Sequence, residues 1–298
     1  MKSAAILPPT LADLSSIESS DDVGDDKGVT VLATTELSPL ADPANEIPAA
    51  LRRIDDADWL VQYEAIEIFR RALVHHAAVA GEYVAAALGA LTAASLNLRS
   101  ATSKNALLAL AECFEFADVR ALSIAPVVQA LMKRAACEKR FLRDAAMHAV
   151  TKLATHVATA PVLVALAAFS ASKSAKLCTA ACSGTMLCLT QMQRDGTILT
   201  PSQLITGQIV EILPPLARFR SGKDAKARED ALVSLQVAAS FAGGNDIFEK
   251  LVSTSIGDKV VATKLLQAVI VSNKRKVLIK APGLRVALQT RKQSAIVS

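Results

Sequence analysis

Apolar residues recur from residue 58 onward with the three- and four-residue spacing of amphipathic helices. Short breaks that carry Pro, Gly or Asn separate these segments. The pattern predicts helices over residues 58–78, 81–95, 98–117, 122–136, 139–157, 160–170, 173–193, 201–219, 223–242, 245–254 and 258–272. We interpret them as consecutive pairs, beginning with 58–78 and 81–95, with the last helix unpaired. The pattern therefore predicts an all-α protein.

A small residue between apolar neighbours recurs in the first helix of each pair. These residues are Ala65, Ala106, Ala146, Ala180 and Ala231, at spacings of 41, 40, 34 and 51. The mean spacing is typical of the two-helix units of HEAT and armadillo repeats, whose stacked layers pack closely at small residues. We therefore expect an α-solenoid of about five to six HEAT-type helix pairs. An irregular helical bundle is the alternative.

The composition agrees with helices packed on helices. Hydrophobic residues make up 52% of the chain and aromatic residues only 4%, so Ala and Leu supply most of the apolar mass. Both residues are good helix formers, whereas sheets favour β-branched and aromatic residues. Twelve Gly and eleven Pro are too few for the many turns of a β-sandwich or barrel.

The N-terminal region differs in charge from the rest of the chain. Residues 1–46 hold nine acidic residues against two lysines, a net charge of −7 in a chain whose total is +5. We expect a disordered acidic leader over 1–46, dispensable for folding, then a solenoid over 47–272 and a basic C-terminal tail over 273–298. Without the leader the chain carries +12, and a basic body favours an acidic partner.

Candidate catalytic and metal-binding residues do not form a recognisable pattern. Cys178, Cys182 and Cys188 are close in sequence, but zinc takes four ligands and the four His residues lie elsewhere. Cys113 lies within a predicted helix with no His near it in sequence, although a distant His brought close by the fold stays open. No glycine-rich phosphate loop occurs. We expect no catalytic residue, metal, cofactor or small-molecule substrate, and therefore no enzyme.

Cysteine usage and hydropathy indicate the compartment. Five Cys without a CxxC pair imply no disulfide framework and indicate a reducing compartment, the cytoplasm. Residues 153–172 carry no formal charge over about a bilayer-spanning length. They include His156 and Pro161, so we interpret them as parts of two buried solenoid helices and expect no membrane contact. His75 and His76 end a predicted helix, where we expect them to cap the last carbonyls.

Nucleic acid is a competing partner for a basic body. Binders of single strands need aromatic side chains on which bases stack, and few of the aromatic residues here lie close to Lys and Arg. Duplex DNA stays open through phosphate contacts alone. We rank nucleic acid below an acidic protein partner.

Basic residues gather where one helix of each predicted pair begins. They are Arg99 and Lys104, then Lys139, Arg140 and Arg143, then Lys173 and Lys176, and finally Lys223, Lys226 and Arg228. Equivalent turns of a solenoid lie side by side, so these charges are expected to form one stripe. Bases in a first helical turn oppose the helix dipole, which favours a functional reason over the alternative of ordinary solvated charges.

Three segments resemble a TOG domain, the HEAT-repeat tubulin-binding module of the CLASP and axonemal TOG-array proteins. Asp58-Trp59-Leu-Val-Gln-Tyr-Glu-Ala65-Ile is similar to the opening helix, and Asn97-Leu-Arg99-Ser100-Ala-Thr-Ser-Lys104-Asn-Ala106 to the second-repeat signature. Lys139-Arg140-Phe-Leu-Arg-Asp-Ala145 is similar to the basic run of the third repeat. The likeness covers about residues 50 to 255, and the second repeat is its most specific part. Gln62, Thr102 and an incomplete sixth repeat depart from the family pattern.

The resemblance implies a protein that binds tubulin or the microtubule lattice, with a structural or stabilising role in the cytoskeleton, including the axoneme of a cilium or flagellum. It implies that the loops within each repeat face tubulin, with Trp59 as an apolar anchor; packing in the core is the alternative role for this side chain. The residues expected on this edge are Trp59, Arg99, Ser100, Lys104, Lys139, Arg140, Lys173, Lys176, Lys223 and Lys226. A HEAT scaffold for another acidic protein is the alternative function, and nucleic-acid binding ranks third.

Overall fold

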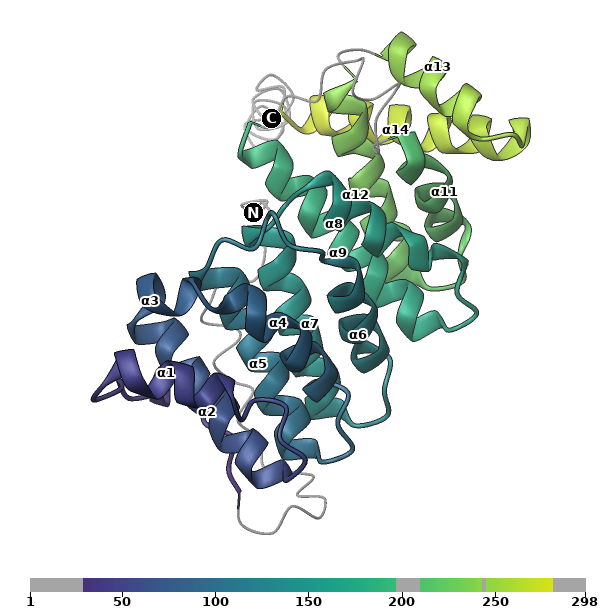
Figure 1. Ribbon diagram of the computed structural model, residues 1–298. Coiled ribbons are helices and arrows are strands. Elements are labelled where there is room, and N and C mark those ends of the chain that lie inside the picture. Colours follow the sequence, from purple (N-terminus) through teal and green to yellow (C-terminus); the bar gives the residue numbers. More distant parts are fainter. Residues whose placement is uncertain (1–28, 197–209, 243–244, 281–298) are drawn as a thin grey trace, which may run out of the picture.

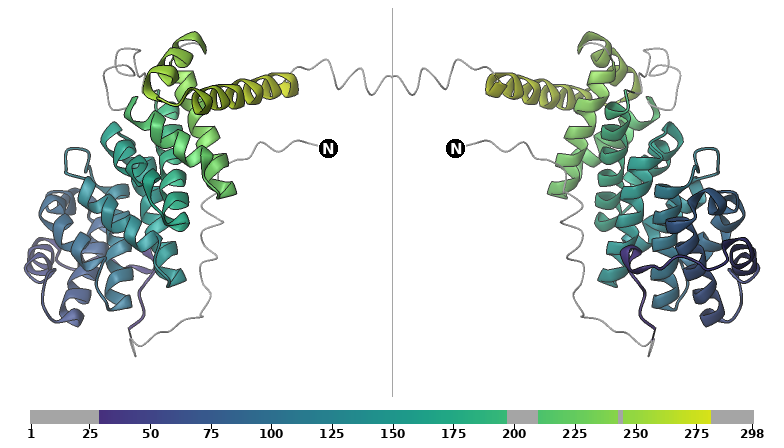
Figure 2. Two further views of the ribbon diagram at one scale, coloured as in Figure 1. Left: turned by 90° about the vertical axis from the view of Figure 1, so that its right-hand side faces the viewer. Right: turned by 90° about the vertical axis from the view of Figure 1, so that its left-hand side faces the viewer.

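The computed structural model describes residues 29–196, 210–242 and 245–280, and its side chains are described up to residue 270. All regular elements in these ranges are helices (Figure 1), so the expected all-α solenoid is confirmed. The helices form two layers that curve together along the chain (Figure 2).

Long helices form the inner layer, each packed beside the next. They are α2 (Trp59–His75), α5 (Ser100–Phe116), α7 (Arg140–His156), α9 (Ala175–Arg194) and α12 (Ala225–Phe241). Shorter helices cover one side of this layer as an outer layer. They are α1 (Pro43–Leu51), α4 (Val84–Ala94), α6 (Ala125–Ala135), α8 (Ala160–Ala167) and α11 (Leu213–Ser221).

The remaining elements are a C-terminal pair and four short pieces. The pair is α13 (Asn245–Ser255) and α14 (Lys259–Lys280). The short pieces are α3 (Ala77–Gly81) and the 3-10 turns η2 (Thr34–Glu36), η3 (Ala168–Ala171) and η4 (Val210–Ile212). α14 is longer than the helix predicted over 258–272, so residues 273–280 are helical and do not belong to a separate tail. Residues 281–298 lie outside the described part of the chain.

The pairing of helices differs from the sequence interpretation. Each inner helix packs chiefly on the outer helix that precedes it in the chain, so α4 pairs with α5 and α6 pairs with α7. The predicted pairing of 58–78 with 81–95 is therefore wrong, because helical periodicity reports the buried face of a helix and not the neighbour that covers it. With the correct pairing, the basic first turns of the inner helices belong to loops inside each repeat.

The small residues of the inner layer are nearly all where the sequence places them. The inner helices have their N-caps at Asp58, Arg99, Lys139, Ser174 and Asp224, at spacings of 41, 40, 35 and 50. The seventh residue after each cap is a fully buried alanine, namely Ala65, Ala106, Ala146, Ala181 and Ala231. The fourth member is thus Ala181, one residue beyond the predicted Ala180. An alanine at this position lets neighbouring helix backbones approach closely.

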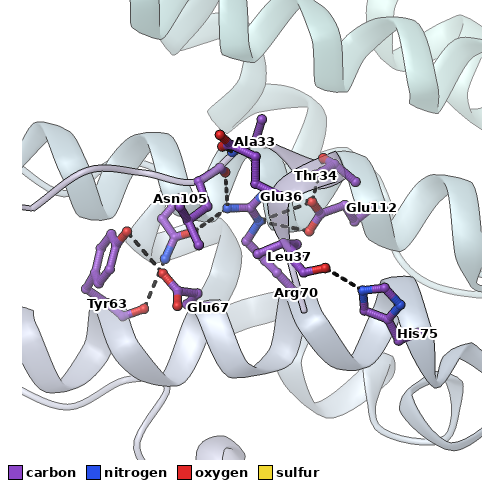
Figure 3. Close-up of polar contacts among 11 residues, drawn as sticks. Ala33, Thr34, Glu36, Leu37, Tyr63, Glu67, Arg70, His75, Asn105 and Glu112 are labelled. Carbon is purple, nitrogen blue, oxygen red and sulfur yellow. Dashed lines mark hydrogen bonds and ion pairs between the residues drawn. The ribbon is translucent and has the colours of Figure 1, made fainter. Parts of the chain in front are cut away.

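An extended segment over residues 29–40, which we call the strap, lies along α2 (Figure 3). Main-chain carbonyls of the strap accept hydrogen bonds from side chains of α2. Tyr63 Oη donates to Thr30 O at 3.1 Å, Arg70 Nη1 to Leu32 O at 2.9 Å, and His75 Nε2 to Leu37 O at 2.6 Å. Arg71 donates to Ser38 O and Pro39 O, both at 2.8 Å.

The prediction of a disordered leader is therefore wrong for residues 29–46. These residues form the strap, which includes η2, and the start of α1. The rest of that leader, residues 1–28, lies outside the described part of the chain. The role predicted for His75 and His76 also needs correction, because the bonds of their imidazoles go to the strap and not to the last carbonyls of α2. His76 Nε2 accepts the amide N–H of Leu40 at 3.2 Å, so both imidazoles hold the strap.

A buried ion pair lies beneath the strap. The side chains of Arg70 in α2 and Glu112 in α5 are 0% and 2% exposed, and the guanidinium Nη2 lies 2.8 Å from the carboxylate. Asn105 Oδ1 accepts from Arg70 Nη1 at 2.9 Å, and the Thr34 hydroxyl of the strap donates to Glu112 at 2.8 Å. Burial raises the pKa of Glu112, and Arg70 opposes that rise. The strap thus supplies two of the hydrogen bonds that such a desolvated pair requires.

Enlarging the buried alanine of α5 is expected to destabilise the fold. Ala106→Leu should lower the free energy of unfolding by about 1 to 3 kcal/mol, because extra methyl groups force neighbouring side chains off their rotamers. Chemical denaturation measures this change. Ala86→Leu is the matched control, since Ala86 is exposed in α4. Equal denaturation midpoints for the two variants would contradict the proposed role of the alanine column.

Removing the strap is expected to destabilise the first repeat. A chain that starts at residue 29 keeps the strap, whereas a chain that starts at residue 41 loses its bonds to α2 and leaves the ion pair open to solvent. The shorter chain should be less stable by about 3 kcal/mol or more, since breaking the contacts of a buried pair is strongly unfavourable. Urea midpoints of both chains and the full chain test this. A chain from residue 41 that melts like the full chain would contradict it.

Candidate binding edge

The loops that enter the inner helices lie along one edge of the solenoid (Figure 1). We call these loops, with the first turns of α2, α5, α7, α9 and α12, the binding edge. Nine of the ten residues predicted from the sequence lie in these loops and turns, and Lys104 lies one turn further into α5; the nine are Trp59, Arg99, Ser100, Lys139, Arg140, Lys173, Lys176, Lys223 and Lys226. The predicted alignment of equivalent turns can therefore be followed from one loop to the next.

A buried amide bridge joins the first two loops. Gln62 Nε2 donates to Ile54 O at 3.1 Å, and Gln62 Oε1 accepts from Asn97 Nδ2 at 3.1 Å. Gln62 is only 8% exposed. The role of Gln62 is therefore structural, because its buried amide joins two loops.

The predicted anchor Trp59 is half-buried at the first turn of α2. The guanidinium carbon of Arg99 lies 5.5 Å from the centroid of its ring, which is a cation–π contact between the first two loops. Asp58 caps the helix by accepting the Leu60 amide at 2.9 Å. Leu60 is itself 40% exposed beside the indole. These contacts hold an aromatic side chain at the surface in a fixed orientation.

Leu98 is the most exposed large apolar side chain among the described residues, at 97%. Its loop is held on both sides. Asn97 Oδ1 accepts the amide of Arg99 at 2.9 Å, and Arg134 of α6 donates to the carbonyls of Ser95 and Asn97, both at 2.7 Å. Sequence reasoning did not select Leu98, because a leucine at the start of a predicted helix (98–117) is ordinarily assigned to the core. The loop thus presents an apolar side chain on a rigid support.

Two further contacts link the second, third and fourth loops. Lys139 Nζ donates to the Ser100 hydroxyl at 2.6 Å, and Lys176 Nζ lies 3.2 Å from the Glu138 carboxylate. Ser100 is buried, so it supports Lys139 from beneath. Lys139 and Lys176 remain exposed and bridge neighbouring repeats. These contacts link basic residues to the neighbouring loops, so part of their charge is used within the edge.

Two arginines of the expected clusters have a structural role. Arg143 Nη1 donates to the carbonyls of Cys137 and Glu138, the two residues before the N-cap of α7. Arg228 Nη1 makes the equivalent bonds to Gly222 and Lys223 before α12. An arginine four residues after the cap therefore fixes the preceding loop in both repeats.

The last part of the binding edge lies at the start of α12. Asp224 caps this helix, and its pKa lies below the usual value because it accepts the amide of Ala227; the hydroxyl of Thr179 in α9 also lowers it. Lys226 Nζ lies 3.1 Å from Asp230, which also accepts from the Ser183 hydroxyl of α9. These contacts continue the linkage between repeats from α9 to α12.

The binding edge thus has two parts of different chemistry. The apolar part, at α2 and α5, consists of Trp59, Leu60 and Leu98, with Arg99 over the indole. The cationic part runs from α7 to α12, and its exposed basic residues are Lys139, Arg140, Lys173, Lys176, Lys223 and Lys226. Lys104 lies one turn into α5 and is partly exposed. The first loop carries acidic residues at 55, 56 and 58, so the positive charge does not extend along the whole edge.

The described residues give little support to a reactive thiol, a metal site or a membrane-spanning helix. Burial raises the pKa of Cys188 to about 12, and burial and the Glu112 carboxylate raise the pKa of Cys113, so both thiols stay protonated. In the described ranges, no group of three His, Cys, Asp or Glu side chains is placed to hold a metal ion. None of the helices there is both long enough and apolar enough to span a membrane.

Comparisons with known proteins identify the class of fold. No protein-family model and no curated protein sequence matches the chain. A structure described as "TOG-tubulin binding specificity promotes microtubule dynamics and mitotic spindle formation" matches with a TM-score of 0.51 and 15% identity, over 80% of this chain and 91% of its own. A designed armadillo repeat protein in complex with the peptide (KR)4 matches with a TM-score of 0.41 and 15% identity, over 76% and 98% of the two chains.

An engineered protein is similar at a TM-score of 0.43 and 18% identity, over 78% of this chain and 97% of its own. The two-layer stack and the likeness to the TOG structure define the chain as a HEAT- or armadillo-like helical repeat protein.

Proposed function

We propose that this chain binds tubulin or the microtubule lattice through the binding edge, and that it acts as a structural or stabilising protein. The observation that carries this proposal is the composition of the edge, in which a rigidly held Leu98 and the indole of Trp59 adjoin a row of exposed cations. The resemblance of the repeat signatures to a TOG domain and the likeness of the fold to a TOG structure support it.

The two parts of the binding edge would contribute to binding in different ways. Exposed apolar side chains on fixed loops lose little entropy on binding, so Leu98 and Trp59 suit a desolvated centre of contact. The cations from Lys139 to Lys226 would attract an acidic surface and orient it during encounter. Together they would fit a partner that presents an apolar depression beside acidic residues.

A scaffold for another acidic protein is the alternative, because the same edge chemistry would serve it. Nucleic acid is less favoured, since the apolar part of the edge offers one indole and no second aromatic platform among its residues. A cytoplasmic and cytoskeletal location, including the axoneme of a cilium or flagellum, belongs to the same proposal.

Reversing charge at the third loop is expected to weaken binding. Lys139→Glu with Arg140→Glu should reduce affinity for microtubules about 10-fold or more, because attraction to an acidic surface becomes repulsion. Co-sedimentation with microtubules and gel filtration with free tubulin measure the change. The matched control is Lys250→Glu with Lys264→Glu, which reverses two exposed cations of α13 and α14. An equal loss of affinity in both variants would show that only net charge matters. It would contradict the proposal that the partner binds at the binding edge.

Truncating the exposed leucine tests the apolar part of the edge. Leu98→Ser should leave the unfolding midpoint unchanged, since the side chain is 97% exposed, yet it should weaken tubulin binding about 10-fold or more if Leu98 is a hot spot. The loss should persist at high salt, because an apolar contact has no long-range field. Val260→Ser is the matched control at a side chain that is 61% exposed in α14. A silent Leu98→Ser would remove the apolar anchor from the proposal.

A further inference from the structure

The strap has a fixed direction on the solenoid. Its contacts run in order along α2, from Thr30 at Tyr63, through Leu32 at Arg70, to Leu37 at His75. Figure 3 shows the last of these contacts. The strap therefore runs parallel to α2, which begins at the binding edge. Its N-terminal end therefore lies near the start of α2, on the side of the binding edge.

The residues just before the strap are acidic. Asp21, Asp22, Asp25 and Asp26 lie three to eight positions before Val29, and residues 1–28 carry six acids against two lysines. Three to eight residues span at most about 10 to 28 Å. Tyr63 is one helical turn from Trp59, or roughly 6 Å. Neighbouring helix axes are about 8 to 10 Å apart, so the first turn of α7 lies roughly 20 Å from that of α2. Asp21 and Asp22 can therefore span the distance to Lys139 and Arg140, and Asp25 and Asp26 extend the acidic segment toward them.

We propose that Asp21, Asp22, Asp25 and Asp26 bind the cationic part of the binding edge within the same chain and compete there with an acidic partner. The proposal rests on the binding edge of the proposed function and adds its regulation. Only the cationic part is affected, because Leu98 and Trp59 offer the aspartates no ionic partner. A partner that also engages the apolar part would displace the aspartates, whereas a merely acidic polymer would compete with them on equal terms.

The expected strength of this contact suits a reversible competitor and not a permanent block of the binding edge. Exposed ion pairs contribute about 0 to 1 kcal/mol each, so four of them give a weak contact in free solution. Tethering raises their effective concentration to roughly the millimolar range, which makes the contact significant within one chain. The contact should disappear as salt shortens the screening length to about 3 Å near 1 M.

Neutralising the four aspartates in the full chain tests the proposal. Asp21→Asn, Asp22→Asn, Asp25→Asn and Asp26→Asn together should tighten binding of fluorescent poly-L-glutamate about 3- to 10-fold at low salt. The difference should vanish near 0.5 M salt, roughly, because the competing contact is ionic. The probe is a plain acidic polymer, so the measurement does not depend on tubulin.

A matched control separates a local contact from net charge. Glu82→Gln, Asp118→Asn, Glu211→Gln and Asp246→Asn make the same change in charge. All four residues are exposed and follow the C-terminal ends of inner helices, at the edge opposite the binding edge: Glu82 and Asp118 lie in connections, Glu211 in η4 and Asp246 in the first turn of α13. The control should change the affinity less than 2-fold or so, in keeping with screening over about 8 Å at physiological salt. Equal tightening in both variants would overturn the proposal.

Zero-length carbodiimide crosslinking of the unmodified chain gives a direct readout. Mass spectrometry should find intramolecular links between residues 21–26 and Lys139, Lys173 or Lys176. Links to Lys250 or Lys264 in their place would overturn the inference. Measurable binding of the probe with no difference between the aspartate variant and the unmodified chain would also overturn it, while leaving the proposed function intact. Absence of probe binding in every chain would refute both the competition and the electrostatic part of the proposed function.

Discussion

The packing of the inner helices at a column of fully buried alanines is the constraint on which the rest of the structure depends. A side chain without further methyl groups at the seventh position after each cap lets α2, α5, α7, α9 and α12 stack in one layer. Packing in the same layer is so tight at Gly184 that a Cβ there would lie 2.9 Å from Val150 Cγ1. Because helices of similar length stack in register, their entering loops are brought side by side, and the binding edge follows from the core.

Much of the fold could be predicted from the sequence because helical period and small-residue spacing are local signals. The column of alanines and the limits of most helices were predictable on this basis. The pairing of helices was not, since an amphipathic face records that a helix is covered but not which neighbour covers it. The prediction of Ala180 was one residue off for a related reason: Ala180 and Ala181 are adjacent small residues, and only the cap at Ser174 decides which of them is the seventh residue after the cap.

The candidate site was predictable in position but less so in chemistry. First-turn charges such as Lys139 and Lys176 were visible in the sequence, yet their contacts with Ser100 and Glu138 join segments nearly forty residues apart. Such pairs depend on the stacking of repeats, which no local pattern encodes. Leu98 was missed for the opposite reason, because residue type alone assigns a leucine to the core. Exposure distinguishes it, and exposure is a property of the folded loop.

The strap shows why composition misled at the N-terminus. Low hydrophobicity and negative charge predict disorder when a segment must bury its own side chains to become ordered. The strap is held chiefly through its carbonyls, which every residue carries, so its composition matters little. The demand for it comes from Arg70 and Glu112, whose desolvated charges require acceptors and donors that α2 and α5 do not provide alone. The same demand sets the direction of the strap, so a buried ion pair in the first repeat determines that the N-terminal end of the strap lies toward the binding edge.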